Sequence, residues 1–197
     1  ICIETGVDFS IDVTLNKFQE ITGVFAGNLI EMHKQACSFS KKDAMVAVNT
    51  RFDTVITSNS GYPLDQNLYQ VVKGLSAAHQ IVKKQGSIYC GAECIDGLPN
   101  HGSYAELLKS KETPLQLLEM IDAPGFHSPD QWQVQIQAQI IQDSKVFLQT
   151  EGLTDKQIIE AHLNPVKSIE DHVNKYSSSD SICVLPEGPQ TIPFLKN

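Results

Sequence analysis

The sequence has 197 residues, with 15 basic against 23 acidic side chains, which gives a formal net charge of −8 at neutral pH. An acidic chain without a basic stripe argues against non-specific nucleic-acid binding, which needs many Lys and Arg to neutralise phosphates. Hydrophobic residues make up 41% of the chain, yet no apolar run approaches the roughly 20 residues that span a bilayer. The composition predicts a soluble globular protein, and the length allows either one full domain plus a fragment or two small domains.

The cysteines favour a reducing compartment. The chain has five of them: Cys2, Cys37, Cys90, Cys94 and Cys183. An odd number of scattered cysteines in a chain of this size is typical of reduced thiols in a cytoplasmic protein rather than of a disulfide framework. The chain begins at Ile1, inside patterned sequence and without a secretory leader. We therefore expect a cytoplasmic location and a piece of a longer polypeptide.

Residues 1–48 are predicted to form a β-hairpin followed by a connecting helix. Apolar and polar residues alternate over 7–15, which is the period of a half-buried strand, and 21–26 predicts its partner. Apolar positions at helical spacing over 29–42 predict the helix. A lone hairpin is marginally stable in water, so its apolar face needs a partner, which we expect upstream.

Residues 49–197 alternate strand and helix patterns. Strands are predicted at 53–57, 87–92, 145–150 and 181–185, and helices at 64–84, 104–109, 113–121 and 132–140. Two further helices begin at Thr154 and Ser168, the first with a capping-box spacing to Gln157. Short connections between alternating elements predict a Rossmann-like α/β domain, a parallel sheet with helices on both faces.

One segment fits two patterns. In 132–140 the apolar residues alternate strictly, as in a strand, whereas Trp132, Ile136 and Ile140 also have the i, i+4, i+8 spacing of a helix. Pro129 just ahead, and the absence of turn residues, favour the helix.

Ligands of open parallel sheets bind beyond the carboxyl ends of the strands. Two predicted loops lie there, 58–64 and 93–101. The first leads backbone N–H groups to a helix N-terminus, which favours an anion such as a carboxylate or phosphate. It contains neither G-x-G-x-x-G nor a Walker A motif, so a dinucleotide or triphosphate is not indicated.

The helix after the first loop has two contrasting faces. Its apolar positions are Leu68, Val71, Val72, Leu75, Ala78 and Val82. Tyr69, Gln70 and Lys73 project from the other side, where an amide, an ammonium group and a phenol suit a carboxylate with an adjacent hydroxyl or carbonyl. A plain solvated helix face explains the same spacing, and spacing alone favours that simpler interpretation.

No metal site or catalytic set is predicted elsewhere. Cys90 and Cys94 with His101 lack the usual C-x2-C spacing and a fourth ligand, so buried structural cysteines are the preferred interpretation. Packing is the preferred interpretation for His33, which shares a helix face with Cys37, and for His79, which falls on the apolar side of its helix. The other histidines have no spaced partner and form no Ser/His/Asp set: His127, His162 and His172.

The segment VITSNSGYPLDQNLYQVVKG at 55–74 resembles the signature of the nickel-dependent lactate racemase family. Supporting matches run in family order along the chain: Phe25-Ala-Gly27 with His33 and Cys37, Ala92-Glu-Cys94 with Asp96-Gly97, Asp130-Gln-Trp132, and Val184-Leu-Pro-Glu-Gly-Pro189. The resemblance implies a two-domain isomerase that interconverts stereoisomers of lactate or a related 2-hydroxy acid. Its cofactor would be a nickel-pincer nucleotide, which accepts a hydride from C2 and returns it to either face of a planar 2-oxo acid.

The resemblance assigns substrate-side roles to four residues of this chain. Lys73 would offset the substrate carboxylate and Gln70 would hydrogen-bond its oxygens, with Tyr69 beside them and Trp132 close to the pocket. The family's catalytic histidines, nickel-binding histidine and cofactor-tethering lysine lie in its N-terminal domain, upstream of Ile1. We therefore expect no catalytic residue, metal ligand or bound cofactor in these 197 residues, and no activity from them alone.

Residues 1–48 then form the end of the N-terminal domain and 49–197 the C-terminal α/β domain. The expected partners are a small 2-hydroxy acid and the upstream domain of the same polypeptide, with neither nucleic acid nor membrane. Two alternatives stay open. One is a stand-alone, non-catalytic α/β module that binds a small carboxylate or phosphate, and the other is a relative that acts on a different 2-hydroxy acid.

Overall fold

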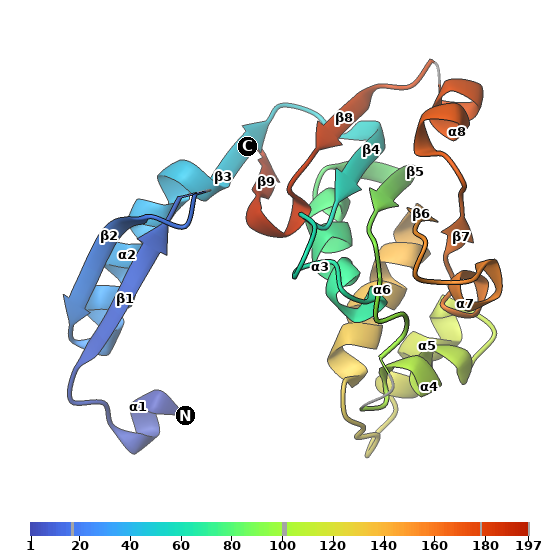
Figure 1. Ribbon diagram of the computed structural model, residues 1–197. Helices are drawn as coiled ribbons and strands as arrows, with labels where there is room; N and C mark the ends of the chain where they lie inside the picture. Colours follow the sequence, from blue (N-terminus) through green and yellow to red (C-terminus); the bar gives the residue numbers. More distant parts are fainter. Residues whose placement is uncertain (17, 100–101, 178, 197) are drawn as a thin grey trace. The chain divides into compact units, whose positions relative to one another are not determined.

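The computed structural model describes residues 1–16, 18–99, 102–177 and 179–196. The chain divides into two compact units, Ile1–Val46 and Ala47–Asn197 (Figure 1). None of the described helices is long and apolar enough to cross a membrane.

The first unit contains the predicted hairpin and helix. Strands β1 (Ser10–Leu15) and β2 (Ile21–Gly27) pair antiparallel, and α2 (Leu29–Ala44) follows with Asn28 as its N-cap. A one-turn helix, α1 (Cys2–Thr5), was not predicted. The strand begins later than its alternating pattern because its pairing starts at Ser10 opposite Gly27, where β2 ends.

Helix α2 packs on one face of this hairpin, and the other face is exposed. On one face Phe25 packs on Phe39 of α2, with ring centroids 5.5 Å apart. The other face has no cover within the described part of this unit and is apolar, with exposed fractions between 42% and 66% for Ile11, Val13, Leu15, Ile21 and Val24. Burial of such a surface is favourable in water, and an exposed apolar face of this kind is typical of an interaction surface.

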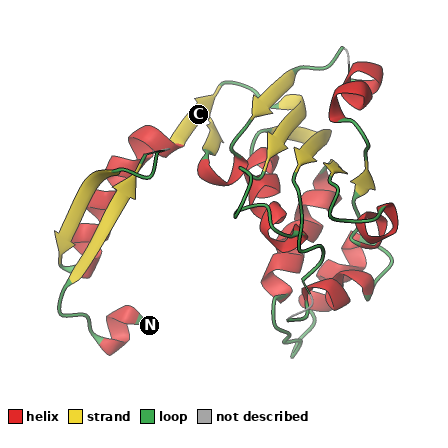
Figure 2. Cartoon of the chain, viewed as in Figure 1, coloured by secondary structure: helices red, strands yellow, loops and turns green. Residues whose placement is uncertain are grey.

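The second unit is built on a five-stranded parallel sheet (Figure 2). The strand order is β7-β6-β5-β4-β8, and each neighbouring pair is parallel. The strands are β4 (Phe52–Ser58), β5 (Val82–Gly91), β6 (Lys145–Gln149), β7 (Asn164–Pro165) and β8 (Ile182–Leu185). The predicted α/β class is confirmed, and β7, only two residues long, is the strand that the sequence pattern missed.

Helices cover both faces of this sheet. On one face, Val55, Ile88 and Val146 are fully buried in one apolar cluster with α3 (Leu68–His79) and α6 (Gln131–Asp143), which lie side by side (Figure 1). On the other face, His172 of α8 (Ile169–Tyr176) packs on Phe147 at 4.7 Å between ring centroids and is 2.9 Å from the Tyr89 hydroxyl through Nδ1.

Short elements complete the second unit. Helices α4 (Tyr104–Lys109) and α5 (Pro114–Ile121) pack against α6, and α7 (Asp155–Glu160) contacts β7. A 3-10 turn, η1 (Gly188–Gln190), packs on α3. The chain then forms β9 (Ile192–Leu195), paired with β3 (Met45–Val48), and the Lys196 N–H donates to the Val48 carbonyl at 2.9 Å.

The helix predicted over 64–84 is shorter, because α3 begins at Leu68 and ends at His79. Before it, the N–H groups of Leu64 and Asp65 close a turn onto the Gly61 carbonyl. After it, Val82 already belongs to β5, which also starts earlier than predicted. Val82 is buried in a strand as it would be in a helix, so its hydropathy does not mark the boundary.

The ambiguous segment is a helix, α6, as predicted. Polar and apolar residues alternate in this helix because two positions of its buried face are glutamines. Gln133 has 1% and Gln137 has 0% of its surface exposed. Gln137 accepts from the Tyr104 hydroxyl and donates to the Ala161 carbonyl at 2.8 Å. Trp132, placed on the predicted apolar stripe, is half-exposed.

The Asp53 carboxylate, near the start of β4, links this strand to β5 and to the segment before β8. Its carboxylate accepts from Lys83 Nζ at 2.7 Å and from the backbone N–H of Ser181 at 3.1 Å, and the Ser181 hydroxyl also donates to it. The hydrogen bond from Lys83, followed by those from Ser181, holds the pKa of Asp53 well below its ordinary value. The ionised form therefore stabilises the fold at pH values above the pKa of Asp53 in the unfolded chain, which is about 3.9.

We expect Asp53→Asn to lower the free energy of unfolding at pH 7, and the difference from wild type to shrink as the pH falls below about 4. The reason is that this stabilisation is lost as the carboxyl group becomes protonated in the folded state. Urea unfolding at a series of pH values measures it, with the exposed Asp96→Asn as a control for the loss of one charge. A difference that is independent of pH would contradict the assignment.

Candidate functional site

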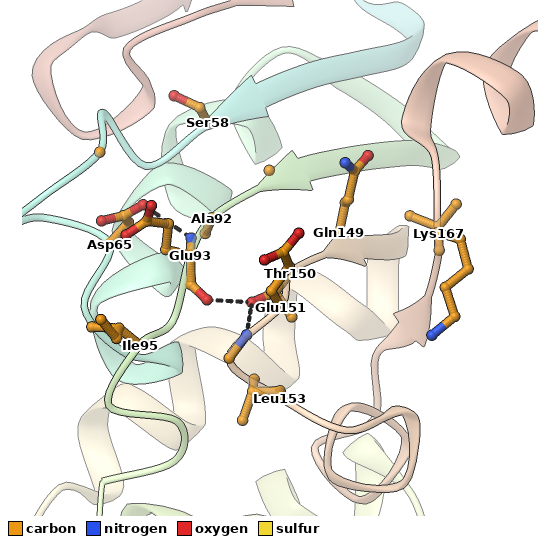
Figure 3. A pocket seen from close by; sticks show the side chains of 14 residues that line it. Ser58, Asp65, Ala92, Glu93, Ile95, Gln149, Thr150, Glu151, Leu153 and Lys167 are labelled. Atoms are coloured by element: carbon orange, nitrogen blue, oxygen red, sulfur yellow. Dashed lines mark hydrogen bonds between the residues drawn. The ribbon is translucent and has the colours of Figure 1, made fainter.

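A pocket of about 1160 Å³ opens at the carboxyl ends of β4, β5 and β6 (Figure 3). The two loops expected from the sequence contribute Ser58 and Gly61 from the first and Glu93 and Ile95 from the second, and Asp65, which the sequence placed in the following helix, also lines the pocket. Residues 149–153 after β6, with Val166 and Lys167 after β7, complete the wall and were not anticipated. Parallel strands bring their carboxyl ends to one edge, so a third loop at this place follows from the topology.

Backbone and side-chain hydrogen bonds fix this pocket. The Glu93 N–H donates to Asp65 Oδ2 at 3.0 Å, and the Glu93 carbonyl accepts from Thr150 Oγ1 at 2.6 Å and from the Gly152 N–H at 3.0 Å (Figure 3). A Cβ at Gly152 would clash with the backbone carbonyl of Cys94. The loops after β5 and β6 are therefore held in direct backbone contact.

Two backbone donors at the start of α3, where the first loop predicts an anion, already have partners within the protein. Asn67 is the N-cap, and its side chain accepts from the Gln70 N–H at 3.2 Å. The Leu68 N–H donates to the Gly97 carbonyl, also at 3.2 Å. Two N–H groups of the first turn are thus satisfied within the protein, which leaves fewer donors for a carboxylate or phosphate there.

The exposed face of α3 presents hydrogen-bond donors. Lys73 Nζ donates to Gln70 Oε1 at 2.7 Å, which occupies the acceptor end of the amide. The donors that remain are the amide N–H groups of Gln70 and two N–H groups of the Lys73 ammonium, beside one lone pair of Gln70 Oε1. A pair that offers donors and a positive charge suits a carboxylate.

Tyr69 and Trp132 form an aromatic contact near this face. Their ring centroids are 5.8 Å apart in an edge-on arrangement, and Tyr69 also packs on Tyr104 at 5.3 Å. Burial, with the nearby charge of Asp130, raises the pKa of Tyr69, so its hydroxyl stays protonated and able to donate. Tyr69 is one turn from Lys73 on α3, which places the two on the same side, although Tyr69 is partly buried rather than solvated.

The structure thus joins the four predicted residues into two contacting pairs, Gln70 with Lys73 and Tyr69 with Trp132. Their role in substrate binding stays a prediction.

Asn59 was not singled out from the sequence, yet it organises the helix that carries Gln70. Its side chain is fully buried. The Asn59 amide donates to the Leu64 carbonyl and, at 3.2 Å, to the Gln70 carbonyl, while its oxygen accepts from the Gly74 N–H at 3.0 Å. In a regular helix the carbonyl of residue 70 and the N–H of residue 74 pair with each other. The Asn59 carboxamide therefore bridges these two groups and ties α3 to the end of β4.

The cysteines and histidines considered from the sequence have structural partners. Cys90 and Cys94 are buried, and burial raises the pKa of Cys94 to about 11 and that of Cys90 further. His101 lies outside the described residues. His162 Nε2 is 2.9 Å from the Leu108 carbonyl oxygen. No group of three or more His, Cys, Asp or Glu able to hold a metal ion occurs among the residues that the structure describes.

His79, expected on the buried side of its helix, is partly exposed instead. It is the last residue of α3, and its Nε2 is 3.6 Å from Asp143 Oδ2. His33 Nε2 is 3.5 Å from Cys37 Sγ on the exposed surface of α2.

Fold and site together define a parallel, Rossmann-like α/β domain with a ligand pocket at the carboxyl edge of its sheet and a donor-rich face on the adjacent helix. Residues 46–192 match the lactate racemase C-terminal domain family. The chain belongs to this family.

Relatives support the same assignment. The chain is 35% identical over 195 residues to a lactate racemase of Thermoanaerobacterium thermosaccharolyticum, covering 96% of this chain and 45% of that protein. It is 33% identical over 186 residues to a lactate racemase of Lactiplantibacillus plantarum, covering 91% of this chain and 43% of that protein. The chain thus spans a little under half the length of these curated relatives.

Solved structures show the same fold. The lactate racemase apoprotein of Thermoanaerobacterium thermosaccharolyticum superposes with a TM-score of 0.91 and 30% identity, covering all of this chain and 48% of that one. A protein from Thermotoga maritima superposes with a TM-score of 0.62 at 12% identity, covering 95% of this chain and 49% of the other, which indicates a shared fold alone.

The Asn59 bridge predicts a large effect on stability. We expect Asn59→Ala to lower the free energy of unfolding by at least about 1–3 kcal/mol, because buried polar groups of the Leu64–Gly74 region lose their partner. Asn59→Asp should cost more, since it turns a carboxylate oxygen toward two carbonyl oxygens. Urea unfolding measures both, with the exposed Asn174→Ala on α8 as control. Losses no larger than the control's would show that the bridge is not needed.

Proposed function

We propose that this chain is the C-terminal half of a nickel-pincer nucleotide-dependent racemase or epimerase that acts on lactate or a related 2-hydroxy acid. Its role is to bind and orient the substrate while C2 is converted reversibly to a planar 2-oxo acid. The observation that carries the proposal is the bonded Gln70–Lys73 pair, which offers donors and a positive charge on α3. Membership in the lactate racemase C-terminal domain family supports the reaction class.

The proposed division of labour follows from what each residue offers. Lys73 and Gln70 hold the carboxylate, because the pair offers the amide N–H groups of Gln70 and the remaining N–H groups and positive charge of Lys73. Tyr69, kept protonated, and the half-exposed ring of Trp132 wall the substrate beside them. These groups orient the substrate, which is the contribution to catalysis that a positioning domain makes.

The residues described here do not fit the nickel cofactor. They include no group of three candidate metal ligands, and the thiols of Cys90 and Cys94 are buried with raised pKa values that disfavour the thiolate that metal binding needs. We therefore assign the cofactor, and the chemistry at C2, to an upstream half of the same polypeptide, and we derive no step through the cofactor from this chain.

The first unit supplies independent support for such an upstream half. The face of the hairpin opposite α2 is apolar and exposed, with Ile11 at 66% and Val24 at 64%. Lactate racemases of other organisms are more than twice the matched length. We propose that the upstream half covers this face, and that residues 1–48 belong to its domain.

The first test is racemisation by the full-length protein, loaded with its nickel cofactor. We expect single enantiomers of lactate, or of another 2-hydroxy acid, to become racemic, as followed by the enantiomeric ratio on a chiral column. The 197-residue chain alone should leave the ratio unchanged. Racemisation by the isolated chain would contradict the assignment of catalysis upstream. Loading with stoichiometric nickel but no turnover of any hydroxy acid would contradict the proposed reaction.

Lys73 and Gln70 can be tested by matched substitutions in the full-length protein. We expect Lys73→Ala to lower kcat/KM by roughly 10- to 100-fold with an unchanged melting temperature, because it removes a charge-assisted hydrogen bond from an exposed position. Gln70→Glu keeps an acceptor for Lys73 but faces the carboxylate with a negative charge, so KM should rise.

Lys156→Ala is the matched control, since Lys156 is 85% exposed on α7 and pairs with Glu160 at 3.7 Å. Wild-type kinetics in Lys73→Ala, indistinguishable from Lys156→Ala, would instead support a solvated helix face.

A further inference from the structure

Two buried carboxamides bind the turn of α3 that carries the proposed substrate-side residues. The Tyr69 carbonyl accepts from Gln133 Nε2 of α6 at 2.5 Å, and the next carbonyl, that of Gln70, accepts from Asn59 at 3.2 Å. In a regular helix the carbonyl of residue 69 also pairs with the N–H of residue 73. The Gln133 side chain therefore reaches the backbone turn that joins Tyr69 to Lys73.

Gln133 directly follows Trp132 in α6, and the two side chains serve different surroundings. Successive residues of a helix point about 100° apart, and Trp132 is half-exposed whereas Gln133 has 1% of its surface exposed. The Trp132 ring lies edge-on to the Tyr69 ring at 5.8 Å between centroids, while the Gln133 amide donates to the Tyr69 carbonyl. Helix α6 thus contacts Tyr69 at both its ring and its backbone.

The hydrogen bond adds direction to a contact between helices that is already cohesive. Val134, Ala138 and Ile140 of α6 are buried in the apolar cluster that also contains the apolar face of α3. Apolar burial is non-directional, and a buried amide costs free energy unless it is hydrogen-bonded. A hydrogen bond weakens steeply when donor and acceptor move out of line. Gln133 therefore fixes the rotation and separation of α3 and α6 at this turn.

From this geometry we propose that Gln133 is a positioning residue for the 2-hydroxy acid. It fixes the donor pair of α3, Gln70 and Lys73, relative to the Trp132 ring of α6, so that the carboxylate anchor and the aromatic wall keep one geometry. The inference rests on the proposed function, in which these groups contact the substrate. Gln133 itself is too deeply buried to touch the substrate, so its effect passes through the Tyr69 backbone.

Gln133→Met in the full-length, cofactor-loaded protein tests this role, because methionine keeps the length of the side chain but has no N–H to donate. We expect kcat to fall by about tenfold or more, since less of the bound substrate is held in a productive orientation. KM should change little, because Lys73 and Gln70 still bind the carboxylate. If Gln133→Met does not fold, Gln133→Asn takes its place, since it keeps an amide but shortens the side chain by one methylene.

Thr54→Val is the matched control for the loss of a buried hydrogen bond. Thr54 is fully buried on the α8 side of the sheet, where its hydroxyl donates to Asp180 Oδ2 at 2.8 Å and lies 3.3 Å from the hydroxyl of Ser177, the C-cap of α8. This variant should unfold at a lower urea concentration and keep the wild-type kcat. A kcat in Gln133→Met equal to that of Thr54→Val would overturn the proposal.

A double-mutant cycle separates positioning from general destabilisation. If Gln133 acts through the turn that carries Lys73, Gln133→Met should lower kcat/KM less in the Lys73→Ala background than in the wild-type background. Equal effects in the two backgrounds would contradict the proposal.

Trp132 supplies a readout that does not depend on racemisation. It is the single tryptophan of the 197-residue sequence, so the tryptophan fluorescence of this chain reports on one ring. Gln133→Met should lower its fluorescence anisotropy and increase its quenching by acrylamide, and Thr54→Val should change neither. Unchanged fluorescence in Gln133→Met would overturn the proposal. Changed fluorescence in a protein that racemises no 2-hydroxy acid would support the positioning of Trp132 by Gln133 and contradict the proposed function alone.

Discussion

A single buried carboxamide holds together the part of this domain on which its proposed function depends. Asn59, at the end of β4, bonds to the carbonyls of Leu64 and Gln70 and to the N–H of Gly74. The close approach leaves no room for a side chain at Gly74, where a Cβ would lie 2.7 Å from Asn59 Oδ1. Gly188 of η1 is similarly confined, with a Cβ position 2.9 Å from the Ser58 carbonyl oxygen. The loop after β4, helix α3 and the 3-10 turn η1 therefore pack so closely that glycine is required at both contact points.

This packing separates two polar surfaces. The outer face of α3 is rich in donors, because Lys73 Nζ donates to Gln70 Oε1 and leaves the amide N–H groups and the rest of the ammonium free. The pocket above β4, β5 and β6 is lined by the carboxylates of Asp65, Glu93 and Glu151 together with Lys167 and Gln149. Both surfaces are set by the same loop, since Asn59 and Asp65 lie six residues apart between β4 and α3.

The local order of elements was predictable from the sequence because it depends on neighbouring residues. Strand and helix alternation gave the parallel sheet, and the Thr154–Gln157 capping box is formed as its spacing predicts. The ends of α3 were not predictable, since Val82 is buried in strand as it would be in helix. The two-residue β7 is too short to show any period.

The site was predictable only in part, for the same reason. Gln70 and Lys73 are three residues apart on one helix, so their contact follows from helical spacing. The contacts of Asn59 with Gly74 and of Asp65 with Glu93 span 15 and 28 residues. Such contacts depend on how the loops meet at the sheet edge, which neither hydropathy nor motif spacing records. The Trp132–Tyr69 contact likewise joins two helices, and only the family resemblance indicated it.

The donor-rich character of the Gln70–Lys73 pair bears on stereochemistry under the proposed function. Two enantiomers of a 2-hydroxy acid share an identical carboxylate and differ only in the arrangement around C2. An anchor that grips the carboxylate alone is therefore indifferent to handedness, and it also accepts the planar 2-oxo acid that lies between them. A catalyst that must bind left- and right-handed forms in turn gains from holding its substrate by the achiral end.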